Sequence, residues 1–147
     1  MDLENMETFE KLQLTLNPNI PVEVLRELAA DEDEEVRANV AENPNAPVDV
    51  LQELAKDEGK WVRYYVARNP NTTVDVLRDL AKDGSWHVRE HVALNSKSSI
   101  NTLVMQFEYE KSLRKPDLYV IEALYVNENL PAFAKRVIET LFGEMLT

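Results

Sequence analysis

Apolar residues recur at helical spacing in short segments of the chain, and polar turns separate the segments. In the stretch 17–42, a first helix is predicted to begin near Pro21 and to end near Asp31. Its apolar face consists of Val24, Leu25, Leu28 and Ala29. A second helix is predicted from about Glu35, with Val36 and Val40 one turn apart on its apolar side. It must stop at Asn43, because a residue that precedes proline is pushed out of helical geometry.

This two-helix pattern is repeated. The triplet Asn-Pro-Asn starts at residues 17, 43 and 69, and a degenerate copy starts at residue 95, so the spacing is 26 residues three times over. The three full copies agree at Asn, Val, Leu, Leu-Ala, Asp, Val-Arg, Val and Ala. A period of this length is typical of a solenoid, whose units bury their apolar faces only against neighbouring units. The predicted fold is therefore an all-α solenoid of 26-residue, two-helix repeats.

The same register gives the expected boundaries of a single repeat domain, 1–147. They are an N-terminal cap at 1–16, repeats at 17–42, 43–68 and 69–94, a longer divergent repeat at 95–126, and a C-terminal capping helix within 127–147. The first helix of the longer repeat is expected to be extended by more than a turn. Its expected apolar face consists of Ile100, Leu103, Val104 and Phe107. The terminal helix carries five apolar residues that need cover: Phe133, Val137, Ile138, Leu141 and Phe142.

The stretch "NPNAPVDVLQELAKDEGKWVRYYVARNPN", residues 43–71, resembles the leucine-rich repeat variant, a bacterial family of HEAT-like helical repeats. The resemblance covers residues 17–95 in three tandem copies. It implies a right-handed superhelix of paired short helices, one of each pair sometimes tightened to a 3₁₀ form, and it implies no activity. Some members carry a cysteine-rich iron-sulfur segment, and this chain, which has no cysteine, departs from them there. A binding scaffold is supported by this analogy of fold alone.

Residues that recur in every unit are explained most simply by stacking. Arg37, Arg63 and Arg89 share one repeat position, and Asp31, Asp57 and Asp83 share another. We expect an Arg–Asp ladder between neighbouring units rather than a catalytic or anion-binding role. The asparagines at 17, 43, 69 and 95 are expected to bond turn backbone.

Variable positions are the better candidates for binding, since the repeat does not dictate them. At 100° per residue, Trp61 and Tyr65 fall on one flank of their helix while Tyr64 and Arg68 point away from the core. Stacking is expected to align Trp61 and Tyr65 with His87 and His91 of the following unit in one ridge, although aromatic residues at helical spacing also occur as ordinary core edge. The candidate partner-binding residues are Trp61, Tyr64, Tyr65, Arg68, Trp86, His87 and His91.

Two short motifs suggest metal sites and are set aside. His87, Glu90 and His91 spell H-x-x-E-H, a zinc-peptidase motif, but the intervening positions belong to the repeat, and no third ligand or substrate cleft is evident. We interpret both histidines as surface residues, with weak adventitious metal binding left open. The acidic run 31–35 lacks the alternating ligands and the glycine of a calcium loop. No metal, cofactor or catalytic residue is predicted.

Composition narrows the function classes. The chain has no cysteine and only three glycines, which removes thiolate chemistry and a glycine-rich phosphate loop. Its 27 acidic and 16 basic residues give a formal charge of −11, which opposes direct nucleic-acid binding and favours a basic partner. No membrane span or signal peptide is evident, so a cytoplasmic location is expected. The predicted function is a non-enzymatic scaffold that binds another protein or a peptide; the alternative is an acidic inhibitor that occupies a basic nucleic-acid groove.

Overall fold

The computed structural model describes residues 1–146, and these form ten α-helices, two short 3₁₀ turns and no strand. Thr147, the last residue of the expected C-terminal cap, lies outside the described residues. The all-α helical-repeat prediction is confirmed, and within each unit helices that follow one another in the repeat pack together. Both members of each helix pair are α-helical, and the 3₁₀ turns occur at Leu3–Asn5 and Gly143–Met145 instead.

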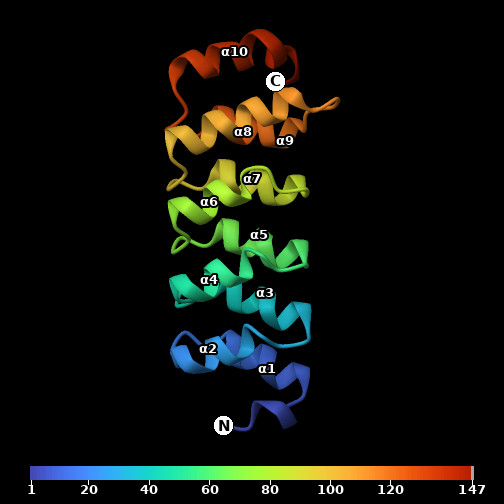
Figure 1. Ribbon diagram of the computed structural model, residues 1–147, viewed down its shortest axis with the longest axis vertical. Coiled ribbons are helices and arrows are strands. Elements are labelled where there is room, and N and C mark those ends of the chain that lie inside the picture. The colour runs from blue at the N-terminus through green and yellow to red at the C-terminus, as the bar shows by residue number, and fades with distance from the viewer. Residues whose placement is uncertain (147) are drawn as a thin grey trace. The chain divides into compact units, whose positions relative to one another are not determined.

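The chain groups into two compact units, Met1–Thr72 and Thr73–Thr147. The first unit contains α1 (Thr8–Thr15), α2 (Val22–Leu28), α3 (Glu34–Glu42), α4 (Val48–Leu54) and α5 (Lys60–Arg68), and Figure 1 labels these helices. The second unit contains α6 (Val74–Leu80), α7 (Trp86–Leu94), α8 (Ile100–Ser112), α9 (Leu118–Val126) and α10 (Ala132–Phe142). In the first unit α3 packs against α1 and α5, and in the second α7 packs against α9. The single-domain boundaries stay a prediction.

Local sequence signals set the helix ends. Asp33 caps α3 by accepting from the Glu35 N–H at 2.9 Å, and Asp117 caps α9 by accepting from the Tyr119 N–H at 3.0 Å. At the other end, α3 stops at Asn43 with φ −62° and ψ 126°, as the following proline requires. Helix α9 stops at Asn127 in the same geometry although the next residue is Glu128. Asparagine therefore ends these helices even where the proline is missing.

The repeated asparagines fasten each turn to the preceding one. The Asn69 side chain is 2% exposed, and its Nδ2 donates to the backbone oxygens of Ala41 at 2.7 Å and Asn43 at 3.0 Å. Its Oδ1 accepts from the Asn71 N–H at 2.8 Å. The equivalent Nδ2 atoms of Asn43 and Asn127 donate to Thr15 O and Ala93 O, respectively. The expectation that this series bonds turn backbone is confirmed, and the bonds also join consecutive repeats.

The expected Arg–Asp ladder is present in the first unit. Arg37 Nε lies 2.7 Å from Asp57 Oδ2, across a gap of one repeat. Burial raises the pKa of Asp57, but hydrogen bonds from Arg37 and from the Gly59 N–H together lower it by more, so the pKa of Asp57 lies below its ordinary value. One repeat earlier, Lys11 takes the arginine's place and pairs with Asp31 at 2.7 Å.

The second unit departs from this ladder. Its Arg89 pairs with Glu110 at the end of α8, not with an aspartate. Helix α8 has 13 residues where α2, α4 and α6 have seven, as the expected extension requires. The extra turns move the carboxylate into the helix itself, and both partners are buried, Glu110 at 0% exposed and Arg89 at 5%.

Two expected apolar faces are covered only in part. On α8, Leu103 and Phe107 are buried, but Ile100 is 55% exposed because it begins the helix, as the exposed Val22, Val48 and Val74 do. On α10, Ile138 is buried while Phe133 and Leu141 are 60% and 55% exposed. In α10 Lys135 replaces the buried leucine that recurs in the preceding helices, a polar substitution typical of a terminal repeat.

Candidate functional site

An exposed surface in the second unit is formed where α7 and α9 lie side by side. At the N-terminal ends of these helices, the rings of Trp86 and Tyr119 stack, with centroids 5.1 Å apart and planes 18° from parallel. Tyr119 is 60% exposed, and Trp86 is half-buried against the core of the second unit. His87 stacks on the Trp86 ring at 3.7 Å. A solvent-facing aromatic platform of this kind is typical of interface anchors.

The remaining outward positions follow from helical spacing. One turn beyond the aromatic residues, α7 presents Glu90 and α9 presents Glu122, and a further turn along lie Leu94 and Val126. Leu94 is 48% exposed and Val126 57% exposed. We call the surface formed by Trp86, His87, Glu90, Leu94, Tyr119, Glu122 and Val126 the α7–α9 face. It combines aromatic, acidic and aliphatic groups within a few helical turns.

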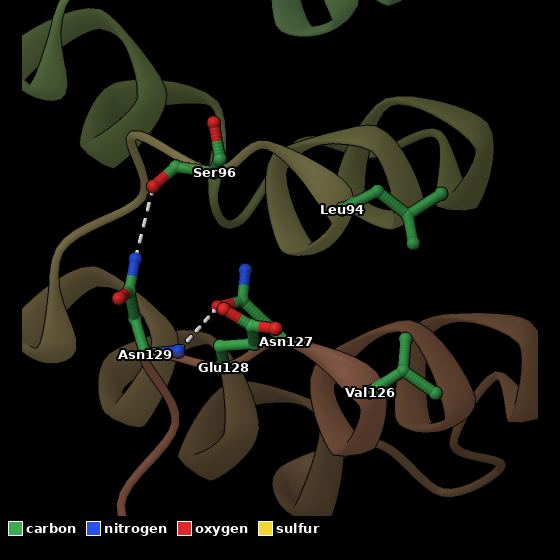
Figure 2. A pocket seen from close by; sticks show the side chains of 6 residues that line it. All are labelled: Leu94, Ser96, Val126, Asn127, Glu128 and Asn129. Carbon is green, nitrogen blue, oxygen red and sulfur yellow. Dashed lines mark hydrogen bonds between the residues drawn. The ribbon is translucent and has the colours of Figure 1, made fainter.

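The α7–α9 face ends in a pocket of about 260 Å³. Figure 2 shows Leu94 and Val126 opposite one another across this pocket, with the polar residues of the two turns beside them. Its lining residues are Leu94, Ser96, Val126, Asn127, Glu128 and Asn129. Both amide groups are engaged, since Asn127 Nδ2 donates to Ala93 O at 2.6 Å and Asn129 Nδ2 donates to Ser96 O at 2.9 Å. The site can therefore offer hydrogen-bond acceptors more readily than donors.

The first unit carries a separate aromatic cluster on α5. The rings of Trp61 and Tyr64 meet edge to face at 5.4 Å, and those of Tyr64 and Tyr65 at 4.9 Å. Trp61 is 43% exposed, and Lys60 Nζ lies 5.1 Å from its ring centroid. Tyr64 therefore contacts both other rings, and the three side chains form an aromatic surface on a single helix.

A pocket of about 190 Å³ lies beside this cluster, lined by Glu42, Tyr65, Arg68, Asn69 and Pro70. This pocket occupies the same repeat position as the pocket of the second unit. Glu42 corresponds to Leu94, and Arg68 corresponds to Val126. Arg68 Nη1 is 3.9 Å from Glu42 Oε1, so these two charges partly satisfy each other. Burial, followed by the charge of Glu42, raises the pKa of Tyr65.

The two histidines of the H-x-x-E-H motif lie one turn apart on α7. His91 Nδ1 lies 3.3 Å from the backbone oxygen of His87 and 3.8 Å from Glu90 Oε2. Within residues 1–146, no group of three or more His, Asp or Glu side chains is arranged to hold a metal ion. The interpretation of both residues as surface histidines stays a prediction.

The structure brings together some of the sequence candidates. Trp86 and His87 are in contact in the second unit, and Tyr64 links Trp61 to Tyr65 in the first. The ridge expected to join Trp61 and Tyr65 to His87 and His91 would connect the two units and stays a prediction. Sequence reasoning missed Tyr119, Leu94, Val126 and Glu128. Tyr119 could have been found from the 32-residue offset of the longer repeat, which aligns it with His87.

Comparison with protein families gives one match. Residues 34–59, which run from α3 through α4 to the start of α5, match the family model "Leucine rich repeat variant". This segment is similar to the leucine rich repeat variant. The resemblance noted in the sequence is thereby confirmed, and the two-helix units on either side follow the repeat's letter pattern. No curated protein and no solved structure matched the chain.

A repeat of this kind presents its variable positions on the outside of paired helices, and the α7–α9 face is made of such positions.

Among the described residues, no helix is both long enough and apolar enough to cross a membrane.

Proposed function

We propose that this helical-repeat protein is a non-enzymatic scaffold that binds another protein or a peptide through the α7–α9 face. The observation that carries the proposal is the stacked pair of Trp86 and Tyr119, with Tyr119 60% exposed at the start of α9. Aromatic side chains lose little conformational entropy on binding and bury a large area, so they supply much of the affinity of many interfaces. A helical repeat supports this role because its frame is fixed by stacking while its variable positions are free to differ.

The arrangement of the charged groups supports a role without catalysis. The partly buried pair of Arg37 with Asp57 and the buried pair of Arg89 with Glu110 join neighbouring helices, which is a structural task. A catalytic site needs titratable groups converging on a cleft with space for a substrate. The α7–α9 face instead presents an exposed Glu122 and a half-buried Glu90. The proposal keeps the cytoplasmic location expected from the sequence, which fractionation of the native host would test.

Affinity capture from the native host, with the full chain as bait, tests the scaffold proposal. Tyr119→Ala should weaken capture of a specific partner about 10-fold or more, because removal of an interface anchor costs about 2 kcal/mol. Phe133→Ala is the matched control, since Phe133 is an equally exposed aromatic residue (60%) on α10, outside the face. Equal capture by both variants and the unchanged chain would contradict the use of this face.

A second candidate function rests on the distribution of charge. Residues 1–72 contain 16 acidic and 7 basic residues, a formal charge of −9, whereas residues 73–147 contain 11 and 9, a formal charge of −2. The first unit is therefore the one suited to an acidic inhibitor that occupies a basic nucleic-acid groove. Binding of that kind should weaken steeply with rising salt, while binding anchored by the Trp86 and Tyr119 rings should lose less affinity.

A further inference from the structure

The pocket at the end of the α7–α9 face differs from its repeat-related counterpart in a way that defines its ligand. In the first unit, the pocket is lined by the charges of Glu42 and Arg68, which lie 3.9 Å apart. In the second unit, the corresponding positions are Leu94 and Val126, and the only charged lining residue is Glu128. This pocket therefore has two aliphatic walls and a carboxylate whose counter-ion must come from elsewhere.

Glu128 is a departure from the repeat. The triplets that begin at residues 17, 43 and 69 place a proline after the first asparagine, whereas the triplet at residue 127 reads Asn-Glu-Asn. The backbone keeps its geometry without proline, since Asn127 has φ −66° and ψ 125°, close to the −67° and 129° of Asn69. The Glu128 side chain is exposed and has no ion-pair partner within residues 1–146. The fold thus does not need a carboxylate at this position.

The side-chain polar atoms that remain available in the pocket are acceptors, and among them only the Ser96 hydroxyl can also donate. The Nδ2 atoms of Asn127 and Asn129 already donate to backbone oxygens of the preceding turn, and Asn127 Oδ1 accepts from the Asn129 N–H at 2.8 Å. The Glu128 carboxylate, the Asn129 Oδ1 and the Ser96 hydroxyl have no partner within the described part of the chain. A ligand with several donors and a positive charge satisfies this set, whereas an anion or an apolar group does not.

From these observations we infer that the pocket receives a single lysine or arginine side chain of the partner. Its methylene groups pack between Leu94 and Val126, and its cationic head donates to Glu128, Asn129 and Ser96. Long basic side chains bury their stems along apolar surface while their charge stays in a polar environment. A volume of about 260 Å³ suits one side chain and lies below the range usual for small-molecule sites. The inference rests on the proposed function and adds the chemistry of the partner.

The neighbouring charges agree with a basic segment. Glu122 on α9 is exposed and has no ion-pair partner among the described residues, and Glu90 on α7 has only a contact with His91 at 3.8 Å. Both lie between the aromatic residues and the pocket. A segment that runs along the α7–α9 face would therefore pass an aromatic platform, two carboxylates and the pocket, which favours basic residues at more than one of its positions.

NMR titration of the full chain with small probes tests the inference without the unknown partner. The probes are N-acetyl-lysine N-methylamide, the arginine equivalent, and N-acetyl-norleucine N-methylamide, which keeps the aliphatic stem but lacks the charge. The two basic probes should shift the Leu94 and Val126 methyl signals and the Asn129 side-chain amide signals in a saturable way, with dissociation constants of about 1 to 50 mM. The norleucine probe should bind at least about threefold more weakly.

Variants then assign the charge. Glu128→Gln should reduce the affinity for the basic probes at least about threefold and remove its salt dependence. Glu122→Gln is the matched control, since it removes the same charge from α9 outside the pocket, and it should leave the affinity within about twofold. Equal binding of the norleucine and lysine probes, unchanged binding by Glu128→Gln, or no shift at about 50 mM would each overturn the inference.

The two proposals fail separately. Loss of partner capture in Tyr119→Ala, with no probe binding in the pocket, would remove the basic-ligand inference and leave the scaffold. Saturable binding of basic probes, with no partner dependent on Tyr119, would remove the proposed function and leave the pocket.

Discussion

Removal of the Glu110 side chain should destabilise the second unit more than any surface charge would. Glu110 is 0% exposed, and its two oxygens accept from Arg89 Nε at 2.5 Å and from the Asp117 N–H at 3.2 Å. Glu110→Ala therefore removes the carboxylate partner of a guanidinium that is itself 5% exposed and otherwise donates to the Asp83 backbone oxygen, and it leaves the Asp117 N–H without its acceptor. Breaking one side of a buried ion pair costs about 3 to 5 kcal/mol.

The magnitude can be measured by urea unfolding, followed by circular dichroism. With a slope of about 1 to 3 kcal/mol per molar urea, the midpoint of the transition should fall by at least about 1 M. Glu108→Ala is the matched control, because Glu108 is an exposed residue of the same helix whose partner is Lys111 at 2.9 Å. That surface pair is worth at most about 1 kcal/mol.

A double change separates the pair from its surroundings. Arg89→Met together with Glu110→Leu removes both charges and keeps similar volume, so it should recover at least about half of the stability lost in Glu110→Ala. A loss below about 1 kcal/mol for Glu110→Ala would refute the reasoning. So would a double variant that is less stable than the single one, since the cost would then come from packing rather than from an unpaired charge.

Two further predictions concern the first unit. Asn69→Ala should cost about 2 to 3 kcal/mol of unfolding free energy, because a 2% exposed side chain with three hydrogen bonds is lost. Asn17→Ala should cost less than about 1 kcal/mol, because Asn17 is exposed and only accepts from the Asn19 N–H. The urea midpoints of the two variants measure the difference, and equal losses would contradict the role of the inter-repeat bonds. Stability should also fall as the pH drops below about 4, because the pKa values of Asp31 and Asp57 are lowered in the folded chain. Their contribution to the free energy of unfolding is complete above the unfolded-state pKa and is lost as the pH falls through the folded-state pKa. Urea midpoints between pH 2 and 7 should show a weaker acid dependence for Asp57→Asn, and an unchanged dependence would count against this assignment.

Much of the fold follows from the sequence alone. The 26-residue period gives the helix pairs, since the positions of Val36 and Val40 are dictated by burial in every copy. The turn asparagines follow as well, because their spacing places one at the end of each second helix. Even the longer α8 is predicted by the 32 residues between Asn95 and Asn127.

The candidate site is less fully determined by sequence. Trp86 and His87 stand out as variable positions, but the stacking of Trp86 on Tyr119 joins residues 33 positions apart and depends on the packing of α7 against α9. The long first helix of the divergent repeat shifts the register, so Tyr119 is hidden from a search at 26-residue spacing. The sequence pattern shows which positions vary between repeats, but it does not show which of those residues contact one another in the folded chain.

Tertiary packing also decided the partners of the charged residues and the pocket. The sequence places an arginine at ladder position 89 without fixing its partner, and the extended α8 brings Glu110 to it, with both side chains buried. Likewise, nothing in the sequence marks Leu94, Val126 and Glu128 as a group, and they line one pocket because consecutive turns stack. The asparagines that join these turns donate their side-chain N–H groups to backbone oxygens, so the pocket presents mainly acceptors. Local periodicity fixes the backbone of such a repeat, because each helix needs the same buried face; the outward chemistry depends on side chains from different helices, and only their packing sets which ones lie together.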